Sequence, residues 1–486
     1  MNRRDFLKRL GLVAAGAALG THRLLAAEDK SKPNFLFIFA DDQTYESICA
    51  LGYDEVQTPN LDRLVRRGTT FTHAYNQGSW SGAVCIASRC MLNTGRFVWN
   101  AQSVFKSSEN ERAAGRFWSE YLKRAGYKTY MTGKWHNPAN TQKAFDVVKD
   151  VRGGMPNQTL QGYNRPIEGQ KDPWSPYDTS FGGYWQGGKH WSEIIGDNGI
   201  EFLAQATRDD KPFFMYLAFN APHDPRQSPK EYVDKYPLEK VKVPSNFLAE
   251  YPYKDSIGCG KDLRDEKLAP FPRTRYSVKV NRQEYYAIIT HMDAQVGRIL
   301  DALEASGKAD NTYIFFTADH GLACGHHGLI GKQNLFDHSV RVPMMIVGPD
   351  VPKGKRLDTP VYLQDIMPTT LELAGVEMPD HVQFRSLMPI IRGQRERNYD
   401  AIYGGYLKLQ RMVTQDGYKL LLYPKCKKAL LFDLAKDPDE MNDLLAAADP
   451  AVAKATARKL FATLLELQKP TGDTLDIRSV YPELCP

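Results

Sequence analysis

Residues 35–42 read Phe35-Leu36-Phe37-Ile38-Phe39-Ala40-Asp41-Asp42, an uninterrupted apolar run followed at once by two acids. A continuous run of this length, rich in aromatic side chains, is typical of a strand that is buried on both faces, as in a parallel sheet covered by helices. Three further runs have the same character and also end in polar residues: 128–132, 213–219 and 313–316. The sequence therefore predicts an α/β fold with a mostly parallel central sheet flanked by helices.

The polar residues that follow these four strands should meet at one edge of the sheet, because ligands collect at the carboxyl ends of parallel strands. They are Asp41, Asp42, Lys134, His136, His223, Asp319 and His320. Three ionised carboxylates cannot crowd together unless a cation offsets their repulsion. Their oxygen atoms favour a hard ion, Ca²⁺ or Mg²⁺. A histidine-rich loop leaves zinc open as an alternative, with Cys324, His326, His327 and His338 as its candidate ligands.

Residues 79–96 supply the second group of candidates. Small residues lead into Cys85 and a helical pattern follows, so Cys85, Ser88 and Arg89 should share one side of a helical turn. The N-terminus of that helix would add partial positive charge and unpaired N–H donors. The stretch predicts a pocket for a tetrahedral oxyanion, although in isolation an ordinary buried cysteine at a helix start would be the better explanation.

The segment Cys85-Ile86-Ala87-Ser88-Arg89, with Thr94-Gly95 after it, resembles the signature of the type I sulfatases, Cys-x-Pro-Ser-Arg followed by Thr-Gly. Alanine stands at position 87, where proline is usual. The resemblance extends over essentially the whole chain after the first 27 residues. It includes the segments 58–62, 133–136, 221–223, 319–321, 331–332, 431–434 and 437–438.

This resemblance implies an alkaline phosphatase-like fold and the hydrolysis of an organic sulfate ester, such as a sulfated saccharide, to an alcohol and inorganic sulfate. In that family a maturation enzyme oxidises the cysteine, here Cys85, to formylglycine, whose hydrate attacks sulfur. The implied metal is Ca²⁺, with Mg²⁺ possible, and its implied ligands are Asp41, Asp42, Cys85, Asp319 and His320. The implied catalytic residues are Cys85, Arg89, Lys134, His136, His223 and Lys332. We expect His223 to protonate the leaving alcohol and His136 to act as the base that releases sulfate.

Two other functions remain open at this point. One is a phosphate or phosphonate ester hydrolase on the same scaffold. The other is a secreted, calcium-dependent binder of sulfated glycans, which would not need proton carriers such as His136 and His223. The sequence between 137 and about 200 predicts a long irregular stretch. Its tryptophans, Trp174, Trp185 and Trp191, could stack on sugar rings or could fix a long surface loop.

The first 27 residues have the pattern of an export signal. Arg3-Arg4 precede an uncharged apolar stretch at 10–19, and Ala26-Ala27 offer a cleavage point. The paired arginines predict twin-arginine export, to a bacterial periplasm or the extracellular space. Because this segment carries most of the formal net charge of +6, we expect no nucleic acid partner. No apolar run is long enough to span a membrane.

At 486 residues the chain exceeds a single core, which predicts two domains. We expect a catalytic domain at 28–380 and a smaller α+β domain at 381–486, with an antiparallel sheet and one helix near 450–468. Thr58 should cap a helix that begins at Pro59, and His291 and Asp293 are assigned structural roles within a later helix. With Cys85 oxidised, the other six cysteines would allow up to three disulfides in an oxidising compartment.

Overall fold

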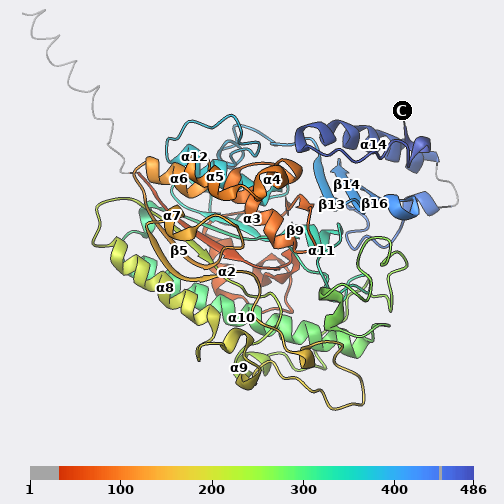
Figure 1. Cartoon of the computed structure of the whole chain (residues 1–486), viewed down its shortest axis with the longest axis horizontal. Coiled ribbons are helices and arrows are strands. Elements are labelled where there is room, and N and C mark those ends of the chain that lie inside the picture. Colours follow the sequence, from red (N-terminus) through yellow and green to blue (C-terminus); the bar gives the residue numbers. More distant parts are fainter. Residues whose placement is uncertain (1–31, 448–450, 486) are drawn as a thin grey trace, which may run out of the picture. The chain divides into compact units, whose positions relative to one another are not determined.

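The computed structural model describes residues 32–447 and 451–485. The expected export signal, residues 1–27, lies outside this part of the chain. The residues from Asn34 onward form one compact unit. The main sheet at its centre has eight strands in the order β11-β2-β10-β8-β1-β7-β5-β6 (Figure 1).

Strand β1, Asn34–Ala40, lies in the middle of this sheet between two parallel neighbours. These neighbours are β8, Thr312–Ala318, and β7, Phe213–Ala218, and β7 pairs in turn with the parallel strand β5, Lys128–Lys134. Every side chain from Phe35 to Ala40 is fully buried, because helices cover both faces of a parallel sheet. The four strands predicted from apolar runs are confirmed.

The other strands of the main sheet lie toward its edges. β6, Val147–Arg152, extends the parallel part beyond β5. On the other side, β10, Met344–Val347, runs antiparallel to β8 and to β2, Thr69–Phe71, and β11, Lys355–Leu357, pairs in parallel with β2. A small second sheet contains β12 (Val361–Tyr362), β3 (Ala74–Tyr75) and β9 (Arg341–Val342). The predicted α/β class with a mostly parallel sheet is confirmed.

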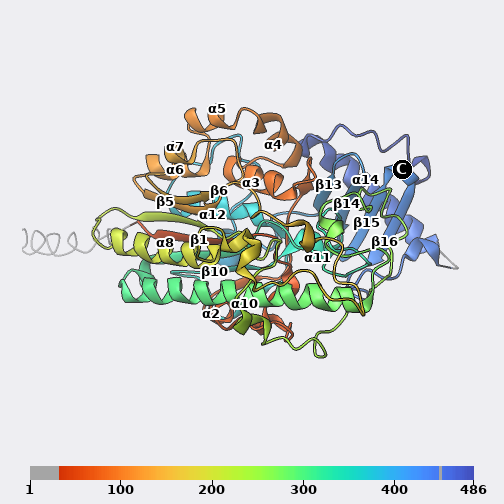
Figure 2. The same ribbon diagram turned by 60° about the horizontal axis from the view of Figure 1, so that its bottom comes forward.

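Helices cover both faces of the main sheet (Figure 2). One face carries α2 (Pro59–Arg67), α8 (Trp191–Ala206) and α10 (Arg275–Ala305), and the other carries α3 (Val84–Thr94), α6 (Trp118–Arg124) and α12 (Ile366–Leu373). The shorter helices are α4 (Val98–Phe105), α5 (Ser108–Ala113), α7 (Thr141–Ala144), α9 (Lys230–Val233), α11 (Asp337–Val340) and α13 (Met388–Ile391).

The C-terminal part forms the expected antiparallel sheet with one covering helix. Its strands are β13 (Ile402–Tyr406), β14 (Gln410–Gln415), β15 (Tyr418–Tyr423) and β16 (Lys428–Asp433), and α14 (Ala451–Thr471) packs on β14 and β15. A fifth strand was not expected: β4, Gly78–Ser79, pairs in parallel with β13. Because β4 ends six residues before Cys85, the C-terminal sheet is joined directly to the segment that carries the candidate nucleophile. The boundary at 380/381 stays a prediction.

The prediction of an irregular stretch from 137 to about residue 200 is wrong at α7 and β6, and it is also wrong for its last part, because α8 begins at Trp191. Two glycines inside this helix weaken the helical pattern in the sequence. A Cβ atom at Gly199 would lie 3.0 Å from Leu217 Cδ1 and 3.1 Å from Ile299 Cγ1. The glycine therefore allows α8 to approach both β7 and α10 closely, and tertiary packing outweighs its low helix propensity.

Helix α2 begins at Pro59 with Thr58 at its N-cap position, as predicted, but the expected capping bond from the Thr58 side chain is absent and the cap comes from another helix. The Thr58 hydroxyl donates to Asp62 Oδ1 (3.1 Å) and makes no capping bond to α2. Instead, Asp293 on α10 accepts from the backbone N–H of Asn60 (3.1 Å) and of Leu61 (2.7 Å). The structural role expected for Asp293 is confirmed, and this long-range cap fixes α2 against α10.

All seven cysteines are free thiols in this structure. None of the described helices combines the length and apolar character that a membrane span requires.

Candidate active site around Cys85

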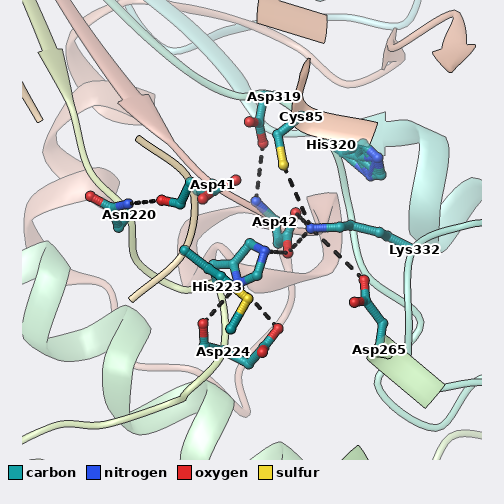
Figure 3. Close-up of polar contacts among 12 residues, drawn as sticks. Asp41, Asp42, Cys85, Asn220, His223, Asp224, Asp265, Asp319, His320 and Lys332 are labelled. Atoms are coloured by element: carbon teal, nitrogen blue, oxygen red, sulfur yellow. Dashed lines mark hydrogen bonds and ion pairs between the residues drawn. The ribbon is translucent and has the colours of Figure 1, made fainter. Parts of the chain in front are cut away.

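Polar side chains from four neighbouring strands meet at one edge of the main sheet (Figure 3). They are Asp41 and Asp42 after β1, Lys134 at the end of β5, His223 beyond β7, and Asp319 and His320 after β8. Each of these side chains is at most 3% exposed. Because β8, β1, β7 and β5 are consecutive in the sheet, their carboxyl ends converge. The structure thus brings together the residues that the strand endings predicted.

Cys85 lies in the first turn of α3 and faces this group, with 2% of its surface exposed. Lys134 Nζ lies 3.3 Å and Lys332 Nζ 3.8 Å from its Sγ atom. Burial alone would raise the pKa of the Cys85 thiol, but the two lysines lower it well below its usual value. The site therefore stabilises negative charge at position 85.

Arg89 follows one helical turn later and points into the same group. Its Nε donates to Asp319 Oδ2 (2.8 Å), and one Nη donates to the carbonyl oxygen of Lys134 (2.7 Å). Ser88, on the same helix, is fully buried, and the Gln364 side chain donates to its hydroxyl over 3.4 Å. Arg89 therefore holds the ends of β8 and β5 together beneath position 85.

Lys332 binds Asp42 through both carboxylate oxygens, at 2.8 and 2.6 Å. On the other side of the same carboxylate, His223 Nε2 lies 3.5 Å from Asp42 Oδ2. Lys134 makes the corresponding ion pair with Asp41. Figure 3 shows Lys332 at the centre of contacts to Asp42 and Cys85. Each carboxylate after β1 thus has one lysine partner that also contacts position 85.

The imidazoles around Cys85 have opposite protonation preferences. Burial, aided by Lys134, lowers the pKa of His136. Burial and Lys332 also oppose the charged form of His223, yet Asp42 and Asp224 raise its pKa to about 10. Both imidazoles also lower the pKa of the Cys85 thiol. At neutral pH the site therefore offers one neutral imidazole and one imidazolium, which is the arrangement of a base and an acid.

The donor set at this edge fits a divalent cation. Ligand atoms of Asp41, Cys85 and Asp319 lie within 4.8 Å of one another. Asp41 Oδ1 and His320 Nε2 are buried and have no hydrogen-bond partner, so both are free to accept a metal. Burial lowers the pKa of His320 to about 3, which keeps the imidazole neutral as ligation requires. Carboxylate oxygens dominate the set and favour Ca²⁺ or Mg²⁺.

Three residues of this network were not predicted: Asp224, Arg264 and Asp265. His223 Nδ1 lies 3.1 Å from Asp224 Oδ1, and Lys332 Nζ lies 4.0 Å from Asp265 Oδ2. Asp224 directly follows His223, and this adjacency was the one feature of the sequence that could have placed Asp224 in the site. Nothing in the sequence connects Arg264 and Asp265 to the site, because they come from a stretch rich in proline and charge.

The structure does not support zinc in the loop after β8. Among the described residues, the groups that gather possible metal ligands all include Cys85. In the loop, His326 pairs with Glu46 (3.0 Å), and His327 stacks on Phe336 with ring centroids 4.0 Å apart.

Trp174 and Trp191 are 5% and 7% exposed. They pack against Arg165 and Arg152, respectively. Trp174 is therefore packed within the long loop and Trp191 joins the start of α8 to the end of β6, and neither presents a sugar-stacking surface.

Two protein-family models match this chain. The model of the family described as Sulfatase matches residues 33–376. A second model, described as N-sulphoglucosamine sulphohydrolase, C-terminal, matches residues 325–469. The first match contains every residue of the candidate site.

The chain is similar to a sulfatase from Formosa agariphila, with 30% identity over 438 residues that cover 85% of this chain and 83% of the relative. It is 25% identical over 519 residues to an N-acetylglucosamine-6-O-sulfatase from Bacteroides thetaiotaomicron, covering 92% of this chain and 88% of that protein. A solved structure of a protein bound to its substrate D-glucosamine-2-N,6-O-disulfate superposes with a TM-score of 0.70 at 24% identity, covering 91% of this chain and 99% of that one. Phosphonate monoester hydrolases share the fold as well.

Proposed function

The chain belongs to the sulfatase family and is a sulfuric ester hydrolase, and we propose that it removes sulfate from a sulfated saccharide through a formylglycine made from Cys85. The observation that carries the proposal is the convergence of two lysines, two imidazoles and three carboxylates on one thiol at a helix start. Saccharide as the substrate class is supported by the relative that acts as an N-acetylglucosamine-6-O-sulfatase.

Formylglycine explains why the site surrounds a cysteine with proton carriers. As an aldehyde hydrate, position 85 would supply one hydroxyl that attacks sulfur and a second whose deprotonation expels sulfate, which a thiol cannot do. A maturation enzyme must therefore act on the segment around Cys85. Alanine at position 87 is the departure from the family pattern there.

The residues that would hold the metal are Asp41, Asp42, Asp319 and His320, together with position 85. When bound, a divalent ion supplies Lewis-acid charge against the oxygens of the sulfate group. Without the ion, Asp41, Asp42 and Asp319 pair with Lys134, Lys332 and Arg89, respectively, and burial and Asp41 raise the pKa of Asp319 well above its usual value. Two added positive charges would make the site attractive to an anionic ester. Ca²⁺ is the proposed ion.

Two lysines and two histidines around position 85 would neutralise charge and transfer protons. Lys134 and Lys332, both against position 85, neutralise charge on the sulfate oxygens as the bond to the alcohol breaks. His223 carries the proton that the leaving oxygen takes up, and neutral His136 accepts the proton from position 85 in the second half of the cycle. Because these residues are nearly all buried, they act with little competition from water.

We expect the protein to prefer a sulfate ester over phosphate and phosphonate esters of the same phenol. The protein should turn over 4-nitrophenyl sulfate faster than 4-nitrophenyl phosphate and 4-nitrophenyl phenylphosphonate under the same conditions. The contrary order would favour the second candidate, a phosphonate or phosphate ester hydrolase, whose solved representatives share the fold. A panel of defined sulfated saccharides, with release of inorganic sulfate as the readout, then identifies the sugar and the sulfate position.

Adding Ca²⁺ to metal-free protein is expected to raise its melting temperature. An ion that binds only the folded state stabilises it by about 2.7 kcal/mol at a concentration one hundred times its Kd. Asp319→Asn should lose this shift, because it removes a proposed ligand. Asp293→Asn is the control: it changes another buried carboxylate, the one that caps α2, and should still show the rise in melting temperature with Ca²⁺. An equal shift in both variants would exclude the proposed ligands, and a larger shift with Mg²⁺ would exclude calcium as the preferred ion.

We also propose that the protein is exported. The support is the paired arginines Arg3-Arg4, the uncharged apolar stretch at 10–19 and the small residues Ala26-Ala27. A polysaccharide substrate outside the cytoplasm would match that location.

A further inference from the structure

The guanidinium of Arg264 lies between two buried carboxylates of the unpredicted network. One Nη lies 2.5 Å from Asp224 Oδ2, and the other contacts Asp265 Oδ1. The side chains of both aspartates are 5% exposed, whereas that of Arg264 is 36% exposed. Arg264 therefore reaches in from the surface and joins the two aspartates at the edge of the site.

Each of these aspartates uses its other oxygen to face a member of the catalytic machinery. Asp224 Oδ1 lies 3.1 Å from His223 Nδ1, and the carbonyl oxygen of Asp224 lies 2.8 Å from the same nitrogen. Asp265 Oδ2 lies 4.0 Å from Lys332 Nζ and accepts from the Gln333 side chain at 2.8 Å. The Arg264 guanidinium is thus linked to His223 through Asp224 and to Lys332 through Asp265.

This geometry requires an arginine. A planar guanidinium offers five N–H donors in a fixed fork and can hold two carboxylates at a set separation, whereas an ammonium is a point charge. Although burial raises the pKa of Asp224, Arg264 and His223 hold it well below its usual value, so this carboxylate is ionised. A buried carboxylate that loses its partner either moves to a new one or disturbs its neighbours. Here the nearest alternative partners are His223 and Lys332.

We propose that Arg264 is a positioning residue for proton transfer to the leaving alcohol. By fixing Asp224, Arg264 holds the His223 ring with Nε2 toward Asp42. By fixing Asp265, it keeps the Lys332 ammonium against Asp42. This proposal rests on the proposed function. As the bond from sulfur to the leaving oxygen breaks, its electron pair stays on that oxygen, which takes the Nε2 proton of His223 and departs as the alcohol. The sulfuryl group passes to an ionised hydroxyl oxygen at position 85, where the site stabilises negative charge, so the His223 proton is the only one transferred in this step.

The expected consequence is a change in sensitivity to the leaving group. Aryl sulfates with acidic phenols need little protonation, whereas those with basic phenols depend on the acid. Arg264→Gln should lower kcat for phenyl sulfate by about tenfold or more, a part of the 10²–10⁴-fold that general-acid catalysis contributes. For 4-nitrophenyl sulfate the loss should stay within about threefold and KM should be nearly unchanged. Arg264→Lys, which can serve one aspartate only, should fall between Arg264→Gln and wild type.

Lys261→Gln is the matched control, since it removes an exposed positive charge from the same segment of the chain. It should leave the leaving-group dependence unchanged. A uniform loss of kcat across the aryl series in Arg264→Gln, or a raised KM with unchanged kcat, would overturn the proposal and make Arg264 a structural or a substrate-binding residue. Arg264→Lys keeps the test decisive if Arg264→Gln does not fold.

Crystal structures of wild type and Arg264→Gln need no turnover, so they separate this proposal from the proposed function. The expected result is that Asp224 or Asp265 reorients and that His223 or Lys332 moves with it. Unchanged contacts of His223 with Asp224 and of Lys332 with Asp42 would overturn the proposal even in an active sulfatase. Absence of sulfate ester turnover by wild type would instead overturn the proposed function, and the crystallographic result would still decide the role of Arg264.

Discussion

Cys85→Ala is expected to abolish sulfate ester hydrolysis while the protein remains folded, with kcat lowered by at least about 10⁴-fold, as for loss of a covalent nucleophile. The physical reason is that Lys134, Lys332, His136 and His223 are all arranged around this one side chain. Alanine has no thiol that could be oxidised to the aldehyde, so no nucleophile forms at position 85, and it leaves those groups in place. The measurement is 4-nitrophenol release, with a thermal melt to establish folding.

Cys90→Ala is the matched control for this variant. Cys90 lies on the same helix and is also a fully buried free thiol, but burial raises its pKa to about 12 and no lysine faces it. We expect this variant to stay active. Mass spectrometry of the tryptic peptides 68–89 and 90–96 should show an aldehyde at position 85 in the first and a thiol at position 90 in the second, in active wild-type protein. A thiol at position 85 in fully active protein, or activity in Cys85→Ala, would rule out the formylglycine mechanism.

The sequence predicted most of the sheet and the edge at which the site lies. The reason is that β1, β5, β7 and β8 are buried on both faces and so appear as continuous apolar runs. Runs of this kind end where the chain leaves the core, and the next residues in a parallel sheet share one edge. Asp41, Asp319 and His223 were therefore placed together without any knowledge of strand order.

Features that depend on contacts between distant segments were not predictable in this way. The pairing of Gly78–Ser79 with β13 spans more than three hundred residues, and two residues are too short to give a strand pattern. Asp293 replaces Thr58 as the cap of α2 for the same reason, since the acceptor comes from another helix. Asp42 and His136 adopt positive φ angles of 66° and 53°, which no local sequence signal indicates.

The sequence predicted only some of the charged residues that neutralise one another in the site. Asp41, Asp42 and Lys134 belong to strand ends, whereas Arg264 and Asp265 come from an irregular segment whose position is set by tertiary packing. An electrostatic site is complete only when each buried charge has its partner. The missing partners could be inferred to exist, but the residues that provide them could not be chosen from the sequence.

Lys134→Met is expected to lower kcat by about 10²–10³-fold, the usual effect of removing one preorganised group that stabilises transition-state charge. Lys134 is fully buried, makes an ion pair with Asp41 and lies 3.3 Å from Cys85 Sγ. Methionine keeps much of the length and volume of the side chain but removes the ammonium. Because the lost interaction strengthens as the sulfate ester breaks, the effect should fall on kcat rather than on KM.

The same change leaves Asp41 without its cation, and breaking a buried ion pair by removing one partner costs about 3–5 kcal/mol. We therefore expect Lys134→Met to melt at a lower temperature than wild type without metal, and to recover more stability than wild type when Ca²⁺ is added, since the ion would take over the neutralisation of Asp41. Lys128→Met, at the start of the same strand and partly exposed, is the control and should affect neither property. Near-normal kcat in Lys134→Met would remove Lys134 from the catalytic group. A melting temperature that responds to Ca²⁺ no more than in wild type would show that Asp41 and the metal do not share one site.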